Sequence, residues 1–206
     1  MATATPIWTD NVSVIAAATL TAGQRTRGTL DLRTKFGAFL FVRMGRKGTA
    51  APSSAIQVQI RRVLNNDAAG GIHPASGSPL QSGTAAGTAT TVNLDSNAGQ
   101  NLLNVTSNAG FAAGDVVCIY DAAFTRLEFH RVSKIAPNAL ALDDNLGFTH
   151  TAAQADNVTR HAEVYPPVWL QGGTLWELVI DYGAATTGAD YVVESRAQVY
   201  DSDSIA

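Results

Sequence analysis

Three stretches of the sequence alternate apolar and polar side chains residue by residue, and this period of two constrains the fold more than any other feature. Residues 55–61, 174–182 and 190–200 all follow the pattern. Successive side chains of a β-strand point to opposite faces of its sheet, so each stretch predicts a strand with one buried and one solvated face. No long segment has the spacing of three and four residues that an amphipathic helix needs.

Shorter apolar runs follow one another closely between residues 102 and 158. Residues 116–120 are β-branched and aromatic, residues 127–135 alternate, and a third run begins after the turn at Pro137 and Asn138. Strands this closely spaced and joined by tight turns are typical of a small antiparallel sheet or barrel. By contrast, residues 36–44 are almost continuously apolar, which predicts a longer strand that is covered on both faces.

The strand pattern breaks between residues 65 and 101, where glycine, serine, proline and asparagine predict a connector. We therefore predict an all-β fold in which an antiparallel, jelly-roll-like β-sandwich carries an inserted small β-barrel domain. Residues 1–75 and 161–206 are expected to form the sandwich, and residues 76–160 the connector and the barrel. Residues 12–20 are expected to be either a first strand or an arm that crosses to a neighbouring subunit.

Charge is distributed unevenly along the chain. Residues 25–62 contain nine basic residues and one acid, a net charge of +8, and residues 163–206 contain one basic residue and seven acids, a net charge of −6. The basic segment is either a charged outer face or a contact surface for an acidic partner. Nucleic acid is not the expected partner, because the total charge is −3 and aromatic residues are not interleaved with the arginines at positions expected to be exposed. The predicted contact residues are Arg25, Arg27, Arg33, Lys35, Arg43, Arg46, Lys47, Arg61 and Arg62.

No pattern in the sequence predicts a catalytic or cofactor site. The histidines, His73, His130, His150 and His161, are far apart and lack the spacing of metal ligands, and His130 is expected at the surface. Cys118 lies in a β-branched run and is expected to be a buried, inert thiol. Because the glycine-rich nucleotide-binding motifs and the GxSxG motif are absent, we predict a protein that is not an enzyme and binds neither cofactor nor metal.

The sequence also lacks the patterns of secretion and membrane insertion. The N-terminal residues do not combine a basic region with an apolar core, and no apolar run approaches the roughly 18 residues of a membrane span. A single cysteine excludes an intramolecular disulfide. These features predict a soluble protein that is made in a reducing cytoplasm and has no membrane partner.

Four segments of the chain resemble small virion structural proteins of tailed bacteriophages. They are TLDLRTKFGAFLFVRMGRKGT at 29–49, GFAAGDVV at 110–117, RVSKIAPNALALDDNLGFTHTAAQADNV at 131–158 and VESRAQVYDSDS at 193–204. The second and third are similar to small β-barrel modules found repeatedly in phage virion components. Within that group the chain most resembles capsid decoration, or cement, proteins, which are commonly trimers on the capsid surface and have no catalytic residues.

The resemblance implies a virion protein that binds the outer surface of the major capsid protein lattice and stabilises the head. Its expected partners are the major capsid protein and copies of itself in a homotrimer, and its expected location is the capsid surface after synthesis in the host cytoplasm. The attachment surface is expected on the sandwich, with the barrel projecting away. The alternatives are a neck, tail or baseplate subunit and a carbohydrate- or receptor-binding module. The latter would stack sugars on Trp169, Trp176 and Tyr182, although the alternation favours core packing for these aromatics.

Overall fold

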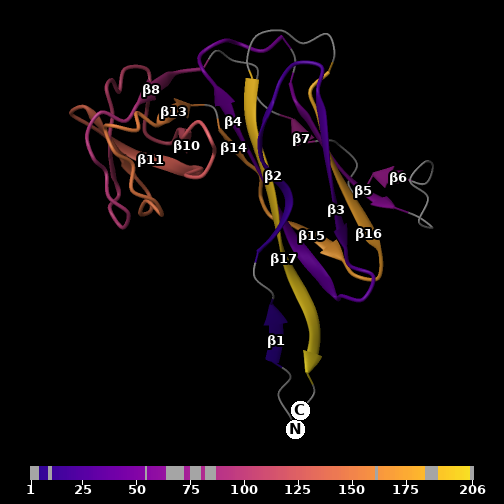
Figure 1. The fold of residues 1–206 in the computed structure, drawn as a ribbon. Coiled ribbons are helices and arrows are strands. Elements are labelled where there is room, and N and C mark those ends of the chain that lie inside the picture. The colour runs from indigo at the N-terminus through magenta and orange to yellow at the C-terminus, as the bar shows by residue number, and fades with distance from the viewer. Residues whose placement is uncertain are drawn as a thin grey trace.

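Every regular element in the described part of the chain is a β-strand. The computed structural model describes residues 5–8, 11–53, 55–63, 72–74, 80–81, 87–160, 162–183 and 190–204. Their strands form three antiparallel sheets, of which two pack face to face and the third curls into a compact unit beside them (Figure 1). The predicted all-β class, a sandwich with a barrel-like part, is therefore confirmed.

The first sheet of the sandwich, sheet A, is built on two long strands. β4 (Gly37–Lys47) and β17 (Asp190–Ser204) pair in register from Gly37 opposite Tyr200 to Lys47 opposite Asp190. The other edge of β17 pairs with β2 (Val12–Leu20) and β1 (Thr5–Trp8), and the other edge of β4 pairs with β14 (Glu163–Val164) and β15 (Val168–Gln171). Residues 12–20 are thus a strand of the chain's own sheet.

The second sheet, sheet B, is centred on β16 (Leu175–Asp181). This strand pairs with β3 (Arg25–Asp31) on one side and β5 (Gln57–Val63) on the other, and β5 also pairs with β6 (Ile72–Pro74) and β7 (Leu80–Gln81). Both sheets therefore combine strands from the two ends of the chain. β7 belongs to this sheet even though it lies within the segment expected to hold the connector and barrel.

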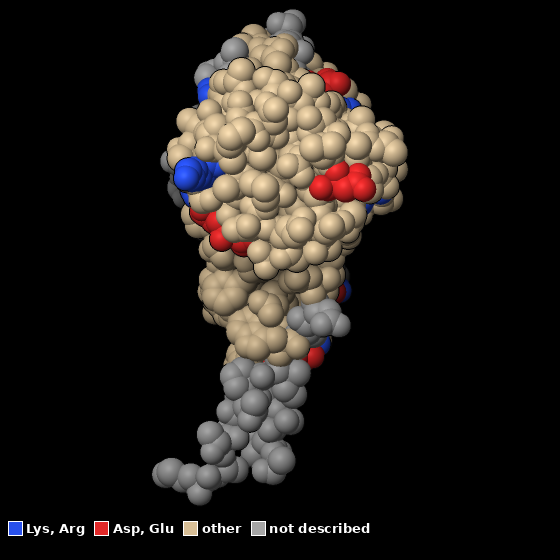
Figure 2. Space-filling view, turned by 90° about the vertical axis from the view of Figure 1, so that its left-hand side faces the viewer, with Lys and Arg blue, Asp and Glu red and all other residues tan. Residues whose placement is uncertain are grey.

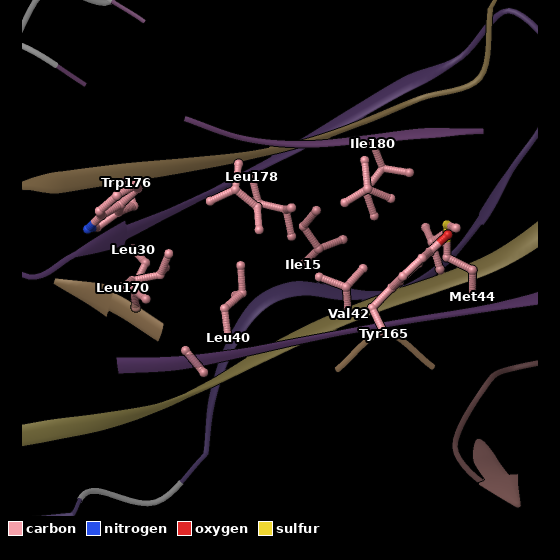
Figure 3. Close-up of a cluster of buried hydrophobic side chains, with 14 of the residues drawn as sticks. Ile15, Leu30, Leu40, Val42, Met44, Tyr165, Leu170, Trp176, Leu178 and Ile180 are labelled. Atoms are coloured by element: carbon pink, nitrogen blue, oxygen red, sulfur yellow. The ribbon is translucent and has the colours of Figure 1, made fainter. Parts of the chain in front are cut away.

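The sandwich core lies between the two sheets and follows the alternation in the sequence. Figure 3 shows Leu40 and Val42 of sheet A facing Leu178 and Ile180 of sheet B. Burying an aliphatic side chain of this size contributes about 1.5–3 kcal/mol, so the period of two is what holds the layers together. Trp176 and Tyr182 are 8% and 0% exposed, which confirms their predicted core packing, whereas Trp169 is 47% exposed and the same prediction is wrong for it.

The third sheet has the strand order β8 (Ala89–Thr91), β13 (Asn157–Arg160), β10 (Val116–Tyr120), β11 (Glu128–Ala136), β12 (Ala139–Leu142) and β9 (Leu102–Asn104). An isolated bridge pairs Val92 and Val105, the residues directly after β8 and β9, so the two ends of the sheet meet and the sheet curls back on itself. We refer to this unit as the barrel. It has a hydrophobic core of its own, including Leu103, Ile119 and Leu140.

The barrel rests on the outer face of sheet A. At this contact a Cβ atom added to Gly45 of β4 would lie 2.5 Å from both Cβ and Sγ of Cys118, so only glycine allows the approach. Cys118 and Val192 belong to one buried cluster, against which Phe129 packs. Because the barrel covers only the end of sheet A around Gly45, the opposite end of the same face stays uncovered by it (Figure 1).

Candidate interaction surface

The basic residues of segment 25–62 are mostly paired within the chain. β3 and β4 lie beside β16 and β17 in the sheets, so basic and acidic segments that are distant in sequence become neighbours. The resulting ion pairs are Arg25–Asp181, Arg27–Glu177, Lys35–Asp201 and Arg43–Glu194, and Arg33 pairs locally with Asp31. The +8 and −6 segments thus neutralise much of each other's charge rather than forming separate surfaces.

The remaining basic residues occupy varied environments. Arg46 is 1% exposed and points into the sandwich, where its Nη2 donates to the hydroxyl of Tyr191 at 3.2 Å. It is therefore not part of the exposed surface of the chain, contrary to its predicted place in a contact surface. Lys47 donates to Thr19 Oγ1 at 3.2 Å, Arg61 donates to Gln59 Oε1, and Arg62 is exposed. Contact between the surface-exposed basic residues and a partner stays a prediction.

The uncovered end of sheet A has a surface of large aromatic side chains, which we call the aromatic face: Trp8, Phe36, Phe39, Trp169 and Tyr200. Phe36, Trp169 and Trp8 are 57%, 47% and 41% exposed. Ring centroids are 5.0 Å apart for Trp8–Tyr200 and Phe39–Trp169, 5.6 Å for Phe36–Tyr200 and 5.8 Å for Trp8–Phe39. Figure 2 shows uncharged surface continuing below the barrel on this side.

The aromatic face is centred on Phe39 of β4, a strand that is apolar on both sides, and Trp8, Trp169 and Tyr200 come from β1, β15 and β17. In β4, Ala38 and Leu40 point into the sandwich, so Phe39 and Phe41 point outward, and both are half-buried. The prediction that residues 36–44 are covered on both faces is wrong for this end of the strand, because the barrel sits at the other end. Exposed apolar surface that is contiguous in this way marks an interaction site in soluble proteins.

A groove lies between the aromatic face and the barrel. Its main hollow has a volume of about 430 Å³ and is lined by Asn11, Phe41, Arg43, Val164, Arg196 and Gln198. Arg43 and Arg196 both form ion pairs with Glu194, which is 2% exposed, and the Arg196 Nε–Glu194 Oε1 distance is 2.9 Å. Two guanidinium groups and one carboxylate leave this group with a net charge of +1.

A second hollow of about 280 Å³ continues the groove under the barrel. It shares Asn11 and Arg196 with the first and reaches Phe124 and Phe148 of the barrel. The groove therefore runs from an apolar floor on β4 and β14, past a cationic centre, to a wall formed by the barrel. This arrangement can hold a partner's side chains, and none of its described lining residues is poised for covalent chemistry.

The barrel contains a chain of charged hydrogen bonds that the sequence did not predict, and it is buried except at Asp144. The ring nitrogens of His130 form hydrogen bonds with carboxylate oxygens of Asp144 at 2.6 Å and Glu128 at 2.7 Å. Those of His150 form hydrogen bonds with carboxylate oxygens of Glu128 at 3.0 Å and Asp156 at 2.7 Å. His130 is 6% exposed, so its expected surface position is wrong. Strand spacing could not reveal the contact, because His150 lies in the loop after β12 and meets β11 only through the fold.

The same contacts shift the pKa values of the network. Burial acts to raise the pKa of Glu128, but hydrogen bonds from His130, His150 and the amides of Gly147 and Phe148 outweigh it, and the pKa lies well below its usual range. Burial acts to lower the pKa of both histidines, but hydrogen bonds to Glu128 and to a second carboxylate raise it. Charged histidines and charged carboxylates therefore stabilise each other inside the barrel.

The network ends at an arginine. Arg126 donates to both carboxylate oxygens of Asp156 at 3.0 and 3.1 Å and lies 3.4 Å from Asp121. Burial acts to raise the pKa of Asp156, but hydrogen bonds from Arg126 and His150 outweigh it and lower the pKa. Both ring nitrogens of each histidine are bound to carboxylates. We therefore assign the network a structural role, in which it fixes the loop between β12 and β13 to the rest of the barrel.

Metal and thiol chemistry find no support in the described residues. Within them, no group of three or more His, Cys, Asp or Glu side chains is arranged to hold a metal ion. Cys118 is fully buried, and burial raises the pKa of its thiol, which confirms the expected inert state. The side chains of His73 and His161 lie outside the described residues. None of the described residues forms a helix long and apolar enough to cross a membrane.

Comparisons with known proteins show only distant likenesses. No family model matches the chain, and no curated protein matches it. Among solved structures it is similar to VP17, a capsid protein of bacteriophage P23-77, with 9% identity and a TM-score of 0.22 over 94% of this chain and 96% of that chain. It is also similar to the complex of VP16 and VP17, the two major capsid proteins of the same phage, with 8% identity and a TM-score of 0.22 over 95% and 98%. At these scores the likenesses carry no argument about this chain.

Proposed function

We propose that this chain is a structural protein of a bacteriophage virion that binds the outer surface of the major capsid protein lattice and stabilises the head. The aromatic face of sheet A is the observation that carries the proposal. Trp169, Phe36 and Trp8 remain 41–57% exposed, and tryptophan, tyrosine and phenylalanine are enriched at the centres of protein interfaces. The resemblance of four sequence segments to phage virion proteins is the reason for proposing a capsid protein as the partner.

In this proposal the stabilisation is mechanical and not catalytic. Burial of the aromatic face supplies most of the binding free energy, since apolar surface contributes about 25 cal/mol per Å² removed from water. Exposed basic residues such as Arg33 and Arg62 add ion pairs worth only ~0.2–1 kcal/mol each. Copies of the chain, which we propose assemble as a trimer after synthesis in the host cytoplasm, multiply these contacts through avidity.

The position of the barrel changes one expectation about this attachment. The barrel and the aromatic face lie on the same side of sheet A, because both contact outward-facing residues of β4 and β17. A capsid bound at the aromatic face would therefore meet the barrel beside the contact, and not find it projecting from the opposite side. We propose that the barrel is an insertion that borders the attachment site.

The proposal is tested by adding purified protein to capsids that lack it. We expect stoichiometric binding and a higher capsid melting temperature, measured by cosedimentation and calorimetry. The variant Phe36→Ser, which changes an exposed side chain, should fold normally and bind more weakly. Capsids that stay bare and equally stable in the presence of wild-type protein would rule the proposal out.

A second candidate, a carbohydrate-binding module, is favoured by one observation. Trp169 is an exposed ring beside Phe39, and Gln171 and Gln198 lie on the strands that flank β4, opposite Gly37 and Phe39 respectively. Trp176 and Tyr182 do not contribute, because they are in the core. Glycan-array binding that is lost in Trp169→Ala would favour this function, and an array without signal would remove it.

A further inference from the structure

We infer that the groove between the barrel and sheet A receives an extended segment of the partner protein that carries an acidic side chain next to apolar ones. The inference rests on the proposed function, because it names the chemistry that the partner must present at the same face. It depends on three features of the groove: an excess positive charge, an apolar floor that continues into the aromatic face, and the small volume of its two hollows.

The positive charge comes from a group of three charged side chains. Glu194 lies at the bottom with 3% of its side chain exposed, while the side chains of Arg43 and Arg196 are 27% and 51% exposed. One carboxylate neutralises only one of the two guanidinium groups. Among the described residues that line the two hollows, no other side chain is charged. A second carboxylate supplied from outside would complete two pairs and accept charge-assisted hydrogen bonds from Arg196.

The apolar floor begins directly beside this charge. Val164 is 50% exposed and pairs in register with Arg43. Further along β4 come Phe41 and then Phe39, which pairs in register with Trp169 of the aromatic face. From Arg43 to the end of the strand at residue 37 the backbone spans roughly 20 Å, the length of about six extended residues. A bound segment would therefore place its acid near the barrel and its apolar side chains over the aromatics.

The small volume of the two hollows favours an extended chain. Hollows of about 430 and 280 Å³ hold a few side chains each, whereas a helix with its side chains is roughly 10–12 Å across. A nucleic-acid backbone fits the groove poorly, since repeated phosphates need several cations and this group provides a net charge of only +1. A polypeptide segment with one acid satisfies both the charge and the apolar surface.

The first test reads the sign of the partner's charge directly. Val164→Asp and Val164→Lys remove the same apolar side chain at an exposed edge position and add opposite charges. If an acid binds beside Val164, capsid binding should be at least tenfold weaker for the aspartate variant than for the lysine variant. Equal affinities of the two variants, or tighter binding of the aspartate variant, would overturn the inference. Unchanged melting temperatures of the free proteins confirm that both variants fold.

The second test removes the exposed guanidinium group. Arg196→Gln should weaken capsid binding about tenfold and make it less dependent on salt, while Arg196→Lys should retain part of the affinity. Arg131→Gln is the matched control, since Arg131 is a 58% exposed barrel arginine outside the groove, and it should bind as wild type. If Arg196→Gln binds capsids as tightly as wild type, the inference is overturned and the proposed function is not. Failure of wild-type protein to bind capsids would instead overturn the proposed function and this inference with it.

Discussion

The two outer faces of the sandwich differ in how completely the chain itself covers them. On sheet B, Val179 faces outward between Arg27 and Gln59 in register and is nevertheless 0% exposed. Long polar side chains lie over such residues and keep their charged ends in water. On sheet A the outward residues are large rings that remain up to 57% exposed. The most highly charged segment of the sequence therefore does not coincide with the exposed apolar surface of the fold.

The origin of this difference is the pairing of strands. β16 brings Glu177 and Asp181 next to the arginines of β3, so Arg25 and Arg27 form their ion pairs within sheet B. β4 instead presents Phe39 and Phe41 outward, and the barrel covers only the end near Gly45. The aromatic face therefore stays exposed in this chain, which is why we propose that a partner covers it. Four predictions follow the same contrast, beginning with the largest effect.

The two tryptophans of β15 and β16, which follow one another in the sequence but belong to different sheets, should respond in opposite ways. Trp176 is 8% exposed and Trp169 is 47% exposed. Trp176→Ala should lower the free energy of unfolding by about 3–5 kcal/mol, because it leaves a cavity in the sandwich core. Trp169→Ala should cost less than about 1 kcal/mol and weaken capsid binding. Urea unfolding and capsid cosedimentation of both variants check this, and equal stability losses would contradict the contrast.

Substituting Gly45 should separate the barrel from sheet A. The side chain of Gly45→Val would overlap Cys118, whose Cβ and Sγ lie 2.5 Å from the position of the new Cβ. Overpacking of this kind costs about 1–3 kcal/mol. We expect greater exposure of the outer face around Val192, seen as increased binding of a hydrophobic dye. Gly48→Ala, at a left-handed turn with open space around it, serves as a control that strains the backbone without touching the barrel.

The barrel and the sandwich should differ in their response to pH. The pKa values of His130 and His150 are raised in the folded protein above the unfolded value of about 6.5. The two histidines therefore stabilise the folded barrel fully below about pH 6.5, and this stabilisation is lost as the pH rises through their folded pKa values. The pKa values of Glu128 and Asp156 are lowered in the folded protein. The two carboxylates therefore stabilise the folded barrel fully above about pH 4, and this stabilisation is lost as the pH falls through their folded pKa values. The barrel should therefore be most stable between about pH 4 and 6.5.

The chain allows the two units to be followed separately in this experiment. All three tryptophans lie outside residues 88–160, so their fluorescence reports the sandwich, while backbone circular dichroism reports both units. Raising the pH from 6 to 9 should lower the stability of the barrel by about 1.4 kcal/mol for each unit by which folding raises the pKa values of the two histidines. The stability of the sandwich should change little over the same range. Replacing His150 by glutamine should reduce this dependence. Identical pH profiles of both units would show that the network does not act locally.

The smallest effect should come from an exposed ion pair of sheet B. The side chains of Arg25 and Asp181 are 46% and 24% exposed, and such pairs are worth ~0.2–1 kcal/mol because water and salt screen them. Arg25→Gln should therefore change the free energy of unfolding by less than about 1 kcal/mol, as measured by urea denaturation in low and high salt. A loss above about 2 kcal/mol would mean that sheet B depends on its outer charges more than the comparison implies.

Much of the secondary structure could be predicted from the sequence because strand alternation is a local property. The alternating stretches at 174–182 and 190–200 correspond to β16 and β17, and the short β-branched run at 116–120 is β10. The same local pattern placed Trp176 and Tyr182 in the core and Cys118 inside a strand, where all three are buried. The division of the chain into two folding units remains a prediction, which deletion of residues 88–160 can test.

The candidate surface could not be predicted in the same way, because it depends on what packs across each strand. Alternation shows that Phe39 and Leu40 face opposite ways, but only the sheet pairing shows that Leu40 meets sheet B while Phe39 meets solvent. The neutralisation of Arg25 and Arg27, the burial of Arg46 and the meeting of His130 with His150 at Glu128 likewise join residues that are distant in sequence. The sequence by itself determined the strands and their two faces. The tertiary structure decided which faces were covered, since burial requires a partner surface and a barrel placed at one end of sheet A covers only that end.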